Sequence, residues 1–166
     1  MTEPRSARIA AGERLFGLGF LLSQLGAHSA VQFHRALEPL GIGPAHVGLM
    51  GAIGREPGRR QQALAEQFGM PPSRMVALVD ELEERGLVER RPDANDRRAH
   101  QLHLTPAGRR TMEKVYRLAE QAEAALTASL TAAEHSQLKS LLRRIADEQG
   151  LTPGVHPGYR WLRPGS

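Results

Sequence analysis

The feature that most constrains the fold is a pair of short segments of helical periodicity that meet across a glycine and two prolines. The first segment, residues 61–67, stops at Gly69, the residue type that best adopts a left-handed helix end. Pro71 and Pro72 then fix the entry of a second helix, which Gly86 ends. The inner face of this helix is formed by Met75, Leu78, Val79 and Leu82. The pattern predicts two helices joined by a three- or four-residue turn.

A basic segment follows in which the apolar period changes from helical to alternating. Val88 and then Leu102 and Leu104 alternate with polar residues around a turn-rich stretch, 92–95, which predicts a β-hairpin. Residues 90–110 hold six arginines and two aspartates, an excess of +4 that equals that of the whole chain. GC-rich codon usage explains why 20 of the 22 basic residues are arginine, but it does not explain the clustering. The clustering favours a polyanionic partner.

Longer helices are predicted on both sides of this region. Residues 13–40 form the first, with Gly41 and Gly43 breaking it before Pro44 opens another. Thr105 is a predicted N-cap after the hairpin, and Thr131 opens a last helix with a capping box. Their apolar stripes are expected to be dimerisation surfaces: Leu18, Leu21, Leu22, Leu25, Leu126, Leu138, Leu141, Leu142 and Ile145.

Composition excludes several classes of protein. The 166 residues include 40% hydrophobic and only 4% aromatic side chains, which favours helix-on-helix packing. Absence of cysteine excludes disulfides, thiolate metal sites and thiol nucleophiles. The apolar run from Leu15 to Leu22 is far shorter than the ~20 residues of a membrane span, so a soluble, cytoplasmic protein without a membrane partner is expected. No histidine pair has metal-ligand spacing, and we expect no metal, no cofactor and no enzymatic activity.

The order of these elements resembles the MarR (multiple antibiotic resistance regulator) family. Its wing signature, D-x-R followed after five residues by L-T-x-x-G, is matched by Asp96, Arg98, Leu104, Thr105 and Gly108. The resemblance implies a mainly α fold with a small β-hairpin wing, in which a winged helix-turn-helix lobe is joined to a helical dimerisation region. The expected regions are an N-terminal arm (1–12), a dimerisation helix and linker (13–45), the DNA-binding lobe (46–110), C-terminal dimerisation helices (111–150) and an irregular tail (151–166).

The resemblance implies a homodimer that binds double-stranded DNA, with Asp96 orienting the wing and Arg98, beside Arg97, entering the minor groove. On the recognition helix, the expected groove-facing residues are Ser73, Arg74, Val76 and Ala77, with Arg74 the base reader. Ala77 departs from the polar or basic residue frequent in the family, so a base code is not transferable. Backbone phosphate contacts are expected from Arg59, Arg60, Arg90 and Arg91.

The function expected from this resemblance is repression of pseudo-palindromic operators, relieved by a small molecule. A phenolic or carboxylate effector is the hypothesis for the crevice near His34, Arg35 and His46, against the alternative that these are ordinary surface or core residues. Two other functions remain open: a winged helix that binds protein, and a regulator that responds to no ligand. A protein-binding wing is expected to carry an apolar patch in place of the arginines.

Overall fold

The computed structural model describes residues 16–93 and 96–156, apart from the side chains of residues 96–98. Helices and strands follow in the order α2 (Leu18–Leu37), η1 (Glu38–Leu40), α3 (Pro44–Arg55), β1 (Arg59–Arg60), α4 (Gln61–Phe68), α5 (Pro72–Glu84), β2 (Val88–Asp93), β3 (Asp96–Leu104), α6 (Pro106–Leu126) and α7 (Ala132–Glu148). The fold is therefore mainly helical with one small sheet, as predicted. The expected arm, residues 1–12, lies outside the described residues.

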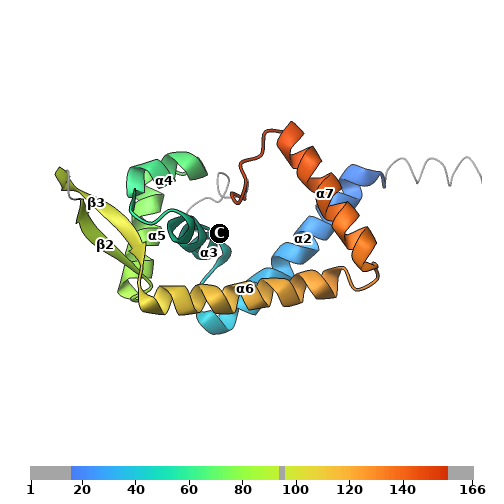
Figure 1. Ribbon diagram of the computed structural model, residues 1–166, viewed down its shortest axis with the longest axis horizontal. Coiled ribbons are helices and arrows are strands. Elements are labelled where there is room, and N and C mark those ends of the chain that lie inside the picture. Colours follow the sequence, from blue (N-terminus) through green and yellow to red (C-terminus); the bar gives the residue numbers. More distant parts are fainter. Residues whose placement is uncertain (1–15, 94–95, 157–166) are drawn as a thin grey trace, which may run out of the picture.

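The helices and strands separate into a lobe and a helical arm (Figure 1). The lobe contains α3, α4, α5 and the sheet, while α2 and α6 lead away from it toward α7. The 21 residues of α6 make a rod of about 31 Å at ~1.5 Å per residue. This rod holds α7 far from the lobe (Figure 1). The division into regions expected from the sequence remains a prediction.

The main hydrophobic core lies inside the lobe. Phe68, Met75, Leu82, Val88 and Leu102 are among its fully buried side chains, so α4, α5, β2 and β3 all contribute to it. A smaller cluster of Leu37, Ile42 and Val115 joins the arm to the lobe. The lobe thus has its own core, and the arm is attached to it through α2 and α6.

The predicted hairpin is present, but it belongs to a three-stranded antiparallel sheet of order β1-β3-β2. The added strand, β1, is the arginine pair Arg59–Arg60, which pairs with Leu102 and Gln101 of β3. These arginines lie between the elements expected from the sequence, because two residues are too short to show strand periodicity. The sheet consequently fixes the direction of both arginines.

The helix ends agree closely with the residues expected to set them. Gly69 and Gly86 have φ values of 59° and 66°, and Thr105 and Thr131 both cap the helices that follow them. The first helix, α2, is shorter than the expected 13–40. It ends at Leu37, because Pro39 has no N–H to continue the α-helical hydrogen bonds and a 3₁₀ turn follows. Likewise, Gly54 to Gly58 were expected to form a connector after the second helix, but α3 continues through Gly54 to Arg55.

The described part of the C-terminal tail turns back from α7 to the lobe. Residues 151–156 contain no helix or strand, as expected, but Val155 packs against the lobe core. The remainder of the tail, residues 157–166, lies outside the described residues. Within the ranges that the structure describes, no helix is both long enough and apolar enough to cross a lipid bilayer.

Candidate nucleic-acid interface

The helix-turn-helix consists of α4, a short turn and α5. Met70 N–H donates to Ala65 O at 2.9 Å, which closes the turn after Gly69, and α5 then starts at Pro72. Met75, Leu78, Val79 and Leu82 are buried, so they form the predicted inner face of α5. Ser73, Val76 and Ala77 are exposed and Arg74 is half-buried. The first turns of α5 therefore present the predicted groove-facing residues around a rigidly packed helix.

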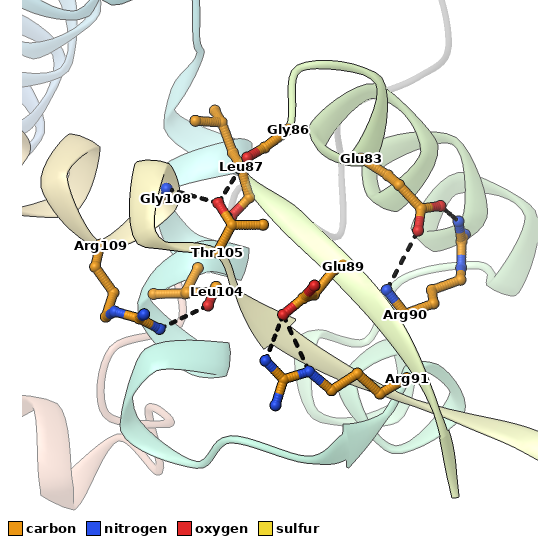
Figure 2. Close-up of polar contacts among 10 residues, drawn as sticks. All are labelled: Glu83, Gly86, Leu87, Glu89, Arg90, Arg91, Leu104, Thr105, Gly108 and Arg109. Atoms are coloured by element: carbon orange, nitrogen blue, oxygen red, sulfur yellow. Dashed lines mark hydrogen bonds and ion pairs between the residues drawn. The ribbon is translucent and has the colours of Figure 1, made fainter.

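The end of α5 is joined to the start of α6 by a compact hydrogen-bonded junction (Figure 2). The Thr105 hydroxyl accepts from Gly108 N at 3.0 Å and donates to Gly86 O at 2.6 Å. Thr105 N–H donates to Leu87 O at 3.1 Å. A Cβ on Gly108 would lie 2.0 Å from that same Leu87 oxygen. The Thr-x-x-Gly sequence thus serves a packing role: it allows α6 to lie directly on the strand entry.

A buried acid holds the outer part of the sheet together. Asp93, only 7% exposed, accepts hydrogen bonds from Arg60 Nε at 3.0 Å and Nη2 at 2.8 Å. Since Arg60 lies on β1 and Asp93 on β2, this pair spans the strand between them. Arg60, expected to be a phosphate clamp, is therefore also a tie within the wing.

Two other predicted clamps have weaker protein partners. Arg59 donates to Gln67 Oε1 at 2.6 Å and lies 3.5 Å from Glu56. Arg91, which is well exposed, pairs with Glu89 two residues away on the same strand (Figure 2). The exposed pair of Arg91 is worth at most ~1 kcal/mol, so Arg91 can exchange its partner for a phosphate, whereas Arg59, whose side chain is 27% exposed, must first release its part-buried bond to Gln67.

Arg90 is held much more extensively. Its guanidinium pairs with Glu83, contacts Asp80 Oδ1 at 2.5 Å and Gln61 Oε1 at 3.2 Å, and its backbone N–H donates to Glu83 Oε1 at 3.2 Å. Burial by itself would lower the pKa of Arg90, but hydrogen bonds and charges from Asp80 and Glu83 outweigh it and raise that pKa above its ordinary value. One side chain of β2 thereby connects to both helices of the helix-turn-helix.

The tip of the wing contains the remaining predicted residues. Asp96 pairs with Asp93 in the strand register, so the chain reverses direction between these positions. The side chains of Asp96, Arg97 and Arg98 lie outside the described residues, and their roles stay predictions. At the base of the wing, Arg109 donates to Leu104 O at 2.8 Å (Figure 2).

The three residues of the effector hypothesis have different surroundings. His34 and Arg35 are exposed in the last turn of α2. His46, on α3, has a side chain only 13% exposed; its Nδ1 accepts from Gly43 N at 3.0 Å and its Nε2 lies 2.8 Å from Glu81 Oε2. Because a backbone N–H only donates, Nδ1 carries the lone pair and Nε2–H donates to Glu81. His46 therefore links α3 to the recognition helix.

Sequence reasoning missed the acids that organise this surface. Asp93 was counted only as charge and Asp80 and Glu83 were not singled out, although the three acids hold Arg60 and Arg90. The i, i+3 spacing of Asp80 and Glu83 placed both on one face of α5 and was a usable signal. No such signal existed for Asp93. The pairing of β2 with β3 is irregular between Pro92 and Asp93, so the alternation of side chains along the strand does not predict which face Asp93 lies on.

Together, the helix pair, the sheet packed beside it and the order of elements define a winged helix-turn-helix DNA-binding protein. Residues 40–99 match the sequence model of the MarR family. A putative transcriptional regulatory protein for the hcr operon of Thauera aromatica is 31% identical over 148 residues, which is 89% of each chain. This chain belongs to the MarR family of transcriptional regulators.

Two solved structures of similar proteins contain DNA. The transcriptional repressor CouR, bound to a 23-mer duplex, is 30% identical with a TM-score of 0.69; the match covers 87% of this chain and 99% of CouR. The Mycobacterium tuberculosis MarR family protein Rv2887, in complex with DNA, is 27% identical with a TM-score of 0.68 and coverages of 78% and 97%. The likeness therefore extends over nearly the whole length of both proteins.

Proposed function

We propose that this protein is a homodimeric repressor that binds pseudo-palindromic operators and releases them when a small molecule binds. The observation that carries the proposal is the combination of a well-packed DNA-binding lobe with an arm whose apolar face is left exposed by the residues that the structure describes. The lobe recognises DNA, and the arm forms the interface with a second copy of the chain. A DNA partner also implies action in the cytoplasm.

The arm supports a dimer through its exposed apolar residues. All nine side chains predicted for dimerisation are between 38% and 65% exposed, with Leu22 and Leu18 at the two limits. Several of them line a groove of about 590 Å³ between α2, α6 and α7, including Leu25, Leu126 and Leu138. Contiguous apolar surface of this kind is rare on monomers, and a second copy of the same arm is its natural complement.

In the proposed complex, α5 enters the major groove and the wing tip enters the adjacent minor groove. Ser73, Arg74 and Ala77 face the base edges, and Val76, which is 40% exposed, is placed for a thymine methyl group. Arg98, oriented by Asp96, contacts the minor groove with Arg97 beside it. Arg59 and Arg91 contribute phosphate contacts by exchanging their protein partners, whereas Arg60 contacts phosphate while it stays bonded to the buried Asp93.

Selection of bound duplexes from a random pool, followed by titration of the selected site, tests this function. We expect a pseudo-palindrome with half-sites about 34 Å apart, because a two-fold dimer matches a two-fold site. Arg98→Ala is expected to weaken operator binding by roughly 1–3 kcal/mol while the dimer stays folded. Unchanged affinity in the Arg98 variant contradicts the wing assignment, and a wild-type affinity without salt dependence contradicts DNA binding itself.

The proposed effector site is the region between arm and lobe near His34, Arg35 and His46, of which His34 and Arg35 are exposed and His46 is held by Gly43 and Glu81. A phenolic or carboxylate molecule bound there would bias the spacing between the two recognition helices and so release the operator. In a calorimetric screen of such metabolites, we expect at least one binder, and that binder should lower operator affinity in a gel-shift titration. If no member of the screen changes operator affinity, this mechanism is excluded and a ligand-independent regulator is favoured.

A further inference from the structure

The contacts of Arg90 assign it a role different from that of its neighbour Arg91. Arg90 joins β2 to Asp80 and Glu83 of α5 and to Gln61, the first residue of α4. Its side chain is 23% exposed, whereas that of Arg91 is 57% exposed and has one acidic partner on its own strand. Of these two adjacent arginines, only Arg90 connects the wing to the helix-turn-helix.

We propose that Arg90 is a positioning residue that fixes the angle between the recognition helix and the wing, and thereby sets discrimination between operator and other DNA. The inference rests on the proposed function. A DNA site contacted by a helix in the major groove and by a hairpin in the minor groove is bound tightly only when the helix and the hairpin have one particular relative placement. Binding to unrelated DNA depends mainly on phosphate charge and tolerates a loose wing.

We call the contacts of Arg90 with Asp80, Glu83 and Gln61 the brace. The chemistry of these side chains suits a positioning role. Arginine presents planar donors that two carboxylates and an amide can share from different directions, and lysine offers no equivalent fork. Asp80 and Glu83 lie one turn apart on α5, so the guanidinium is held against a length of the helix rather than at one point. For such an arginine, the loss of two charge-assisted hydrogen bonds to the acids costs more free energy than the loss of one phosphate contact.

Substitution of the two acids provides a test, because phosphate binding and positioning by Arg90 predict changes of operator affinity in opposite directions. In the double variant Asp80→Asn with Glu83→Gln, a phosphate-binding Arg90 would be freed, and the loss of two negative charges would strengthen binding to any duplex. For a brace, we expect operator affinity to fall about tenfold, since charge-assisted hydrogen bonds between wing and helix are lost. Affinity for an unrelated duplex is expected to stay the same or rise.

A matched control removes two acids that take no part in the brace. Glu84→Gln with Glu113→Gln changes one exposed residue of α5 and one of α6, with the same change of charge. We expect its affinities for operator and unrelated DNA to be unchanged or higher. A tenfold loss of operator affinity in this control as well would overturn the proposal, because the loss would then not depend on Arg90's partners.

Lysine variants of the two arginines separate positioning from phosphate binding while keeping the charge. Arg90→Lys is expected to lower the ratio of operator to unrelated affinity about fivefold with an unchanged salt slope, because no phosphate contact is lost. Arg91→Lys should leave the ratio unchanged. A salt slope reduced by about one in Arg90→Ala, with equal losses on both duplexes, would mean that Arg90 binds phosphate and would overturn the proposal.

Hydrogen exchange of the free protein gives a readout that needs no DNA. Amides of residues 88–93 should exchange faster in the Asp80→Asn, Glu83→Gln variant than in the wild type or the control, because the wing has lost its tie to α5. Equal exchange overturns the brace even where DNA binding is intact. A wild-type protein that ignores every duplex overturns the proposed function, and with it the role in discrimination.

Discussion

Gly108→Ala is expected to destabilise the protein by about 3–5 kcal/mol, a large part of the ~5–15 kcal/mol that stabilises a typical domain. The added methyl group would lie 2.0 Å from Leu87 O, a backbone atom that cannot rotate away. To relieve the overlap, the start of α6 must move off the strand entry. That movement lengthens the bonds from Thr105 to Gly86 O and Leu87 O, leaving polar groups of the junction unsatisfied.

Urea unfolding followed by circular dichroism measures this loss. Gly51→Ala is the matched control: Gly51 is also a buried helical glycine of the lobe, but its added methyl group would meet only Arg55 and Met112 atoms at 3.6 and 3.8 Å. The control should be neutral or stabilised by up to ~1 kcal/mol, because alanine favours a helix over glycine. If both variants unfold at the same urea concentration as the wild type, the packing role assigned to Gly108 is wrong.

Leu142→Glu is expected to convert the proposed dimer to a monomer and to lower operator affinity at least about a hundredfold. Leu142 lines the apolar groove of the arm, where a second copy would cover it and a carboxylate would be buried without a partner. With the dimer lost, each lobe must find its half-site independently, and the gain from linked binding, ~10²–10⁴, disappears. The lobe should remain folded, since Leu142 is not part of its core.

Sedimentation equilibrium and gel-shift titration together check this result. Ser140→Glu adds the same charge to the opposite face of α7 and is expected to leave the dimer intact. Truncation of the chain before Leu138 should also abolish dimers, because it removes most of the apolar face of α7. A Leu142 variant that remains dimeric and binds its operator with wild-type affinity would exclude this face as the dimer interface.

Much of the lobe could be predicted because its signals are local. Gly69 and Gly86 end helices through their own backbone freedom. Thr105 and Thr131 each cap a helix by accepting a hydrogen bond from an N–H only three residues further along the chain. The inner face of α5 follows from helical spacing alone. For the same reason, the exposed apolar stripe of α7 was predicted from the sequence, since Leu138, Leu141 and Leu142 recur on one helical face.

The sequence by itself determined which residues cap the helices, which faces are apolar and which family the chain resembles, because each of these depends on residues close together along the chain. Tertiary structure alone decided how the arginines are used. Arg90 and Arg91 are adjacent and identical in chemistry, yet one is held by Asp80 and Glu83 across the lobe and the other by its own strand. The difference arises because alternation along β2 turns successive side chains in opposite directions, and only the packing of β2 beside α5 gives Arg90 its partners.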